Sequence, residues 1–242
     1  TNMKIFSLSS TYINMNMEIA IRGALGTQLF EYLCGLDFAQ GAGQTVEKIT
    51  ISTGGKVVAP VKVDWLSQII EVPYPINVGL GTAKQDVWKR PEVFKSLASS
   101  NIITNIKLKQ PIVKNNLKIL HVRGLDRTIA SIDDYVLILK SIGPHAKLVG
   151  DDNEFINTII DKAGVGQNIS KGVLDDWHMC AGAKELYCAF TNFTLSALLF
   201  DKGKKYRMLS KANSNGSVVI HDPAYNCVNQ MFSHYFTNAT WM

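Results

Sequence analysis

The stretch LKILHVRGLDR (residues 117–127) begins as an apolar strand and ends in a cluster of charged side chains. Residues 117–122 form a short apolar run of the kind found in buried strands, and Gly124 then interrupts the pattern. Because side chains alternate along a strand, His121 and Arg123 are expected on the same face. In open sheets of parallel strands, ligands bind at the carboxyl ends of the strands. This stretch therefore predicts a parallel sheet with a polar site at its edge.

Strand-like and helix-like patterns alternate along the rest of the chain, which predicts an α/β fold with parallel sheets and crossover helices. Further strands are expected at residues 18–21, 46–52, 56–63, 146–149, 185–190, 206–209 and 218–220. Helices are expected at residues 28–40, 154–163, 175–183 and 194–200, from Pro91, from Ser131 and in the tail from Tyr225. Ser131 and Asp134 have the spacing of a capping box. The pattern loosens into polar residues around Pro111, which predicts one domain over residues 1–110 and another over residues 111–242.

Composition narrows the class of protein. The chain has 242 residues, of which 46% are hydrophobic and 19% charged, as in ordinary globular domains. The net charge of +5 suits an anionic small ligand, and the scattered basic residues do not predict nucleic-acid binding. No apolar run is long enough to predict a membrane span. The four cysteines lack CxxC spacing, and the polar start lacks the pattern of a signal peptide, so buried thiols and a cytoplasmic location are expected.

Three strand ends carry residues that could bind an anion or a metal, and each also has a structural interpretation. The loop at residues 22–28 could present backbone N–H groups to a phosphate, or could be a tight turn. Arg123 could hold a phosphate, or Arg123 or Arg127 could pair with Asp126. Asp151 and Asp152 could hold Mg²⁺, or Asp152 or Asn153 could cap the helix that follows, which the pattern favours.

Four blocks, taken in order, resemble the α-1,2-fucosyltransferases and their α-1,6 relatives. Residues 21–40 resemble a GGLGNQ-[LM]-F-Q-Y-x-x-G pattern. The residues that match this pattern are Gly23, Leu25, Gly26, Gln28, Leu29, Phe30, Tyr32 and Gly35. Residues 121–127 resemble H-x-R-R-x-D, with Gly124 in place of the second arginine. Residues 148–155 resemble a strand-DD-P-E-W segment. Residues 175–199 resemble a later block through Asp176, Met179, Phe193 and Thr194, with Leu195-Ser196 in place of a tryptophan pair.

The resemblance implies a GT-B-like fold, in which two Rossmann-like domains flank a cleft. It implies an inverting, metal-independent fucosyl transfer from GDP-fucose to a glycan hydroxyl, with no cofactor. It places Arg123 on the β-phosphate as the catalytic group, Asp176 on guanine and His121 in the nucleotide pocket. Gly26, Gln28, Asp126, Thr191, Phe193 and Thr194 complete the expected substrate-binding residues. Glu31 and Asp126 are the candidates for the base that takes the acceptor proton.

Three other interpretations stay open. The chain could use a different nucleotide sugar, or bind a nucleotide without catalysis. It could also be a plain α/β protein in which the charges at the strand ends only form salt bridges.

Overall fold

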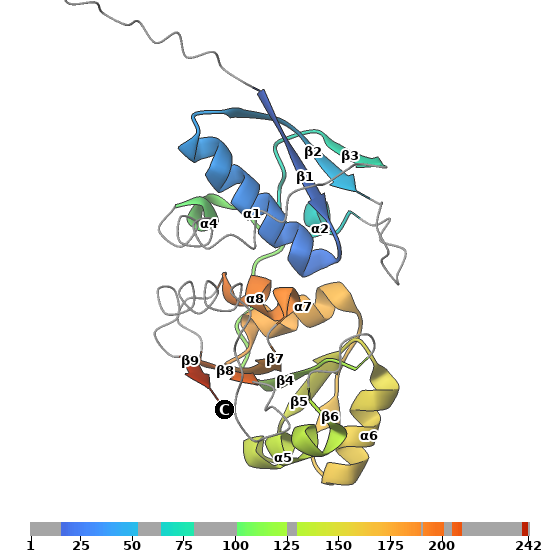
Figure 1. Ribbon diagram of the computed structural model, residues 1–242. Coiled ribbons are helices and arrows are strands. Elements are labelled where there is room, and N and C mark those ends of the chain that lie inside the picture. The colour runs from blue at the N-terminus through green and yellow to red at the C-terminus, as the bar shows by residue number, and fades with distance from the viewer. Residues whose placement is uncertain are drawn as a thin grey trace, which may run out of the picture.

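The computed structural model of the chain describes residues 16–52, 64–79, 101–124, 130–189, 191–200, 205–209 and 239–241. Two parallel sheets lie at different levels, with helices α1, α7 and α8 between them and helices α5 and α6 on the far side of the larger sheet (Figure 1). The predicted α/β class with two parallel sheets is confirmed. The predicted strands at residues 56–63 and 218–220, and the predicted helix from Pro91, lie outside the described residues.

The smaller sheet has the order β1-β2-β3, and its strands are parallel. It contains β1 (Asn16–Arg22), β2 (Thr45–Ser52) and β3 (Ile76–Gly79), with helix α1 (Leu25–Gly41) crossing from β1 to β2. Two short helices, α2 (Leu66–Ile69) and α4 (Ile102–Asn105), accompany this sheet. The sequence pattern missed α2 and α4, because four residues form little more than one helical turn, and it also missed β3.

The larger sheet has the order β6-β5-β4-β7-β8-β9 among the described strands, all parallel. The strands are β4 (Lys118–Val122), β5 (Lys147–Gly150), β6 (Gln167–Asn168), β7 (Glu185–Ala189), β8 (Lys205–Leu209) and β9 (Ala239–Trp241). The strand order reverses between β4 and β7, which is a topological switch point. Residues 239–241 pair with β8 as a strand, which corrects the helix predicted for this part of the tail.

Four helices cover the larger sheet: α5 (Ile132–Ile142), α6 (Asn153–Ala163), α7 (Val173–Gly182) and α8 (Asn192–Leu198). Ser131 and Asp134 form the predicted capping box at the start of α5. Gly164 ends α6 in the left-handed conformation at φ 69°, where glycine carries no steric penalty. No helix in the described part of the chain is long and apolar enough to cross a membrane.

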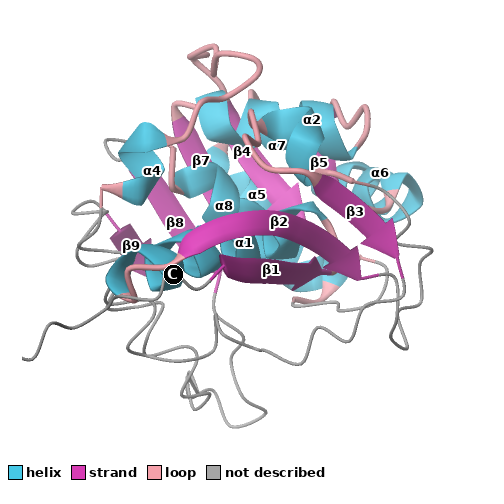
Figure 2. Cartoon of the chain, turned by 90° about the horizontal axis from the view of Figure 1, so that it is seen from above, coloured by secondary structure: helices cyan, strands magenta, loops and turns pink. Residues whose placement is uncertain are grey.

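The chain passes from the smaller to the larger sheet around residues 110–114. Before this passage, Lys109 donates a backbone hydrogen bond to Ile69, and after it Asn115 donates one to Gly182. We refer to the described residues up to 109 as the first unit and to those from 115 on as the second unit. The division into two domains at 110/111 stays a prediction. Viewed from above, strands β1 and β2 run at an angle to strands β4 and β7 (Figure 2).

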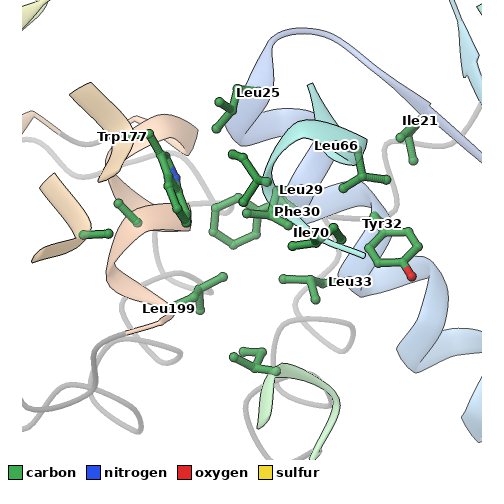
Figure 3. Packing of buried hydrophobic residues seen from close by; sticks show 14 of the residues in the cluster. Ile21, Leu25, Leu29, Phe30, Tyr32, Leu33, Leu66, Ile70, Trp177 and Leu199 are labelled. Atoms are coloured by element: carbon green, nitrogen blue, oxygen red, sulfur yellow. The ribbon is translucent and has the colours of Figure 1, made fainter. Parts of the chain in front are cut away.

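One hydrophobic core runs through both units. Phe30 and Leu33 of α1 belong to the same buried cluster as Trp177 and Leu199 of the second unit (Figure 3). A second cluster, which includes Tyr135, Leu139 and Ile156, lies under α5 and α6 on the opposite face of the larger sheet. Cys34, Cys180 and Cys188 are buried free thiols, as predicted.

The first turn of α1 makes a close contact with the second unit. A Cβ on Gly26 would overlap the backbone of Asn192 and Phe193, at the start of α8. Beside it, the side-chain amide of Asn192 donates a hydrogen bond of 3.0 Å to Thr27 Oγ1. Glycine at position 26 therefore allows two helix starts to meet backbone against backbone.

Gly26→Ala should lower the free energy of unfolding by about 1–3 kcal/mol, since backbone cannot yield as a side chain can. Gly41→Ala is the matched control, because a Cβ there meets nothing within 4 Å, at the other end of the same helix. It should be neutral, or stabilising through the higher helix propensity of alanine. Urea unfolding of both variants measures the difference, and equal stabilities would contradict this role of Gly26.

Candidate functional site

The candidate site lies where strands β4 and β7 end, at the switch point of the larger sheet. His121 is aligned with Cys188 of β7, so the residues that follow each strand emerge side by side. Arg123 and Gly124 follow β4, and Thr191, Asn192 and Phe193 follow β7. Five of the predicted site residues lie at these two strand ends or in the helix start that follows β7: His121, Arg123, Thr191, Phe193 and Thr194.

His121 is a buried, neutral part of this site. Its side chain is only 4% exposed and stacks on the ring of Phe193, with centroids 5.1 Å apart and planes inclined by 21°. Burial, together with the smaller effect of the positive charge of Arg123, lowers the pKa of His121 to about 3. Its Nδ1 atom has no hydrogen-bond partner among the described residues. The imidazole therefore serves here as an uncharged ring that fixes Phe193 against β4.

Arg123 forms an ion pair that the sequence analysis did not anticipate. Its Nε atom lies 3.1 Å from Asp151 Oδ2, and the two side chains are 27% and 26% exposed. Its backbone N–H donates to the Tyr135 hydroxyl at 3.2 Å. The expected partner, Asp126, and the second candidate cation, Arg127, both lie outside the described residues. A pair this exposed contributes only about 0–1 kcal/mol to stability, so stability alone does not explain it.

The two aspartates after β5, Asp151 and Asp152, form different contacts. Asp152 is the N-cap of α6, and its Oδ1 accepts the Phe155 N–H at 3.0 Å, as the sequence pattern favoured. Asp151 instead accepts the Gly124 N–H at 2.9 Å and pairs with Arg123. Within the described ranges, no group of three or more His, Cys, Asp and Glu side chains could hold a metal ion.

Asp176 lies in the first turn of α7 and is engaged by its own loop. It is 3% exposed, its Oδ1 accepts the Lys171 N–H at 3.0 Å, and its Oδ2 contacts the Ser170 hydroxyl. Ser170 Oγ also lies 3.0 Å from the carbonyl oxygen of Gly150. Burial raises the pKa of Asp176, which these hydrogen bonds oppose. The carboxylate therefore fastens the loop between β6 and α7 to the first turn of α7, and Ser170 of that loop contacts the end of β5.

Thr191 and Thr194 start helix α8. Thr191 Oγ1 accepts the Thr194 N–H at 3.3 Å, the two hydroxyls lie 3.1 Å apart, and Thr194 Oγ1 donates to the Thr191 carbonyl at 3.1 Å. This is the arrangement of a threonine at a helix start. Asn192, between them, makes the hydrogen bond to Thr27 that joins the two units. This role of Asn192 could not be predicted from the sequence, because its partner is 165 residues away.

The site residues that were predicted in the first unit form hydrogen bonds or packing contacts within the protein. Gln28 is fully buried; its Nε2 donates to the Gly23 carbonyl at 2.9 Å, and its Oε1 accepts the Trp65 and Leu66 N–H groups. It thereby ties the loop after β1 to the start of α2. Gly23 itself has φ 81°, which fits the tight turn considered for this loop. Gly26 packs against α8, as described above.

Glu31, one of the two candidate bases, is only 5% exposed and is therefore not a surface residue of the helix. It belongs to α1, which is buried on nearly every side because it lies between the two sheets. Burial raises the pKa of the neighbouring Cys34 thiol, and the charges of Asp37 and Glu31 act in the same direction.

The neutral state of His121 makes stability depend on pH. Its pKa in the folded protein, about 3, lies below the value of 6.5 for an unperturbed histidine, so the unfolded chain holds one more proton between these values. The free energy of unfolding should fall as pH drops below 6.5, by up to about 1.4 kcal/mol per pH unit from this residue.

The measurement is the difference in urea-unfolding free energy between the wild type and His121→Gln from pH 7 to pH 5. The advantage of the wild type should shrink toward pH 5. The exposed His145→Gln should leave the pH profile parallel to that of the wild type. A parallel profile for His121→Gln would show that this imidazole is not held neutral.

No protein-family model matches the sequence, and no curated protein matches it. Solved structures similar to this chain include NodZ α-1,6-fucosyltransferase co-crystallised with GDP, at 14% identity and a TM-score of 0.44, covering 75% of this chain and 91% of that one. They also include Escherichia coli heptosyltransferase WaaC with ADP, at 12% identity and a TM-score of 0.47, covering 94% and 92%. E. coli ADP-heptose heptosyltransferase II is similar at 9% identity and a TM-score of 0.46, covering 93% and 90%.

Proposed function

We propose that the chain is a glycosyltransferase that transfers a sugar from a nucleotide diphosphate donor to a hydroxyl of a glycan. The observation that carries this proposal is the position of Arg123, a guanidinium at the carboxyl end of β4, beside the switch point. Ligands of open α/β sheets bind at such points. The order of four sequence blocks along residues 21–199 supports fucosyl transfer from GDP-fucose in particular.

The proposed glycosyl transfer requires one positive charge at the diphosphate and no metal ion. As the bond between the sugar and the diphosphate breaks, negative charge grows on the leaving β-phosphate, and the Arg123 guanidinium stabilises it. A sugar hydroxyl of the acceptor attacks from the opposite side and inverts the configuration at the anomeric carbon. That hydroxyl must pass its proton to a base, for which Asp126 is the candidate by sequence position.

Two versions of this proposal differ in the nucleotide base of the donor that the protein recognises. The resemblance assigns guanine to Asp176, but both carboxylate oxygens of Asp176 already bind the Ser170–Lys171 loop. This engagement favours a second candidate, a transferase that takes a nucleotide sugar with another base. Calorimetric titration with GDP, ADP and UDP separates the two, and donor hydrolysis or transfer assays separate an enzyme from a protein that only binds nucleotide. If no nucleotide binds, the proposed function is wrong.

Arg123→Ala should reduce turnover by roughly 10²–10³, because it removes a charge-assisted contact that strengthens as the diphosphate leaves. Arg123→Lys should restore little, since an ammonium group cannot make two parallel hydrogen bonds to phosphate. Lys140→Ala is the control, because it removes an equal charge from an exposed position in the last turn of α5. Comparable losses in Lys140→Ala would mean that only net charge matters.

Nucleotide binding and transfer should survive EDTA, because Asp152 caps a helix and Asp151 is paired with Arg123. The same assays are repeated with added Mg²⁺ or Mn²⁺ after chelation. A strict requirement for either ion would replace this account with one in which the aspartates after β5 bind a cation.

A further inference from the structure

The ends of strands β4 and β5 approach each other unusually closely because of two glycines. Gly150 is aligned with Val122, and a Cβ at position 150 would overlap the Val122 carbonyl oxygen. A Cβ on Gly124 would lie 3.0 Å from both Asp152 Cβ and Phe155 Cδ1. Side chains at these two positions would push the ends of the strands apart. The residue directly after β5, Asp151, is thereby placed against the residues directly after β4.

Asp151 uses both of its oxygens on this neighbour. Oδ1 accepts the Gly124 N–H at 2.9 Å, and Oδ2 pairs with Arg123 Nε at 3.1 Å. One carboxylate therefore holds the backbone of the loop and the guanidinium that the loop carries. The Arg123 backbone is held independently, by the Tyr135 hydroxyl at 3.2 Å, and the Tyr135 ring packs edge-on against Phe155 at 6.1 Å.

We propose that Asp151 is a positioning residue for Arg123, which fixes the guanidinium through its Nε edge so that the terminal nitrogens face the diphosphate. This inference rests on the proposed function for the identity of the ligand. The geometry supports it in two ways. A guanidinium is planar, so a bond at Nε sets the direction of both terminal nitrogens. A carboxylate that also binds the loop backbone sets their position relative to the sheet.

Removal of the Asp151 carboxylate also has a simpler, electrostatic effect on anion binding, and this effect has the opposite sign. A carboxylate next to Arg123 also cancels part of its charge, so its removal on electrostatic grounds alone should strengthen anion binding, by roughly fivefold. Removal of a positioning group should weaken binding, by roughly tenfold, as the loss of supporting hydrogen bonds does at other preorganised sites. The sign of the change therefore distinguishes the two roles.

Two substitutions separate charge from geometry. Asp151→Asn removes the charge and keeps one oxygen, which can accept from Gly124 or from Arg123 but not in the same way from both. Asp151→Glu keeps the charge and displaces it by one methylene. If Asp151 positions Arg123, both variants bind GDP and pyrophosphate more weakly. Asp133→Asn is the matched control, since Asp133 pairs with Lys162 at 3.5 Å on the exposed surface of α5.

The test combines calorimetry with a signal from Arg123 that needs no nucleotide. In protein with ¹⁵N-labelled arginine, the Nε–H resonance of Arg123 is assigned by its absence in Arg123→Lys. We expect this resonance to be slow in hydrogen exchange in the wild type and in Asp133→Asn. Both Asp151 variants should exchange at least tenfold faster. Asp151→Glu should bind both ligands roughly tenfold more weakly, whereas Asp151→Asn should bind them roughly twofold more weakly, because the loss of the negative charge offsets roughly fivefold of the lost positioning.

Unchanged Nε–H exchange, or stronger binding by Asp151→Asn, would overturn the positioning role. Should the wild type bind neither GDP nor pyrophosphate while the exchange result holds, the proposed function fails and the ion pair is a structural contact only. The ligand assignment of this proposal would then be wrong as well. The two failures are therefore distinguishable in one set of samples.

Discussion

The close contact between Gly26 and the start of helix α8 is the constraint on which the rest of the structure depends. Only a hydrogen atom fits where the Gly26 side chain would be, so the first turn of α1 and the first turn of α8 meet along their backbones. The hydrogen bond between Asn192 and Thr27 lies at the same place. Through this contact the core of the first unit continues into that of the second, as Trp177 and Phe30 in one cluster show.

The same contact governs the candidate site. Asn192 and Phe193 are neighbours in the chain, so fixing Asn192 against α1 also fixes Phe193 over His121. Burial keeps His121 neutral, and Arg123 beside it makes a second positive charge still less favourable. The site thus presents its charge through Arg123, held by Asp151, at the reversal of strand order. The packing between the two units therefore also determines the geometry of the candidate site.

The sequence predicted the architecture well where periodicity is strong. Helix α6 and strand β7 were expected within one residue of their observed bounds, and the capping box at Ser131 was anticipated, because each depends on local pattern. Short helices such as α2 escaped detection, since four residues form little more than one helical turn. The tail at residues 239–241 was misassigned because pairing with β8, which is distant in sequence, decides its conformation.

The strand end that carries the candidate site could be predicted from the sequence, but the contacts of its side chains could not. The end of the apolar run correctly indicated that His121 and Arg123 lie at the carboxyl end of a strand, while their position on one face stays a prediction. The partner of Arg123 was not found, because Asp151 comes from another strand, although both residues share the signal of a charge directly after an apolar run. Gln28 and Asp176 were expected to face a ligand, and each proves to hold a neighbouring loop. Such partnerships depend on tertiary structure, which pattern alone does not contain.

The most direct test of this account is a crystal structure of the chain with GDP. We expect the β-phosphate oxygens within hydrogen-bonding distance of the terminal nitrogens of Arg123, at the carboxyl ends of β4 and β7, with the Asp151 ion pair intact. A diphosphate bound at another edge of either sheet, or one that reaches Asp151 and Asp152 only through a metal ion, would contradict it.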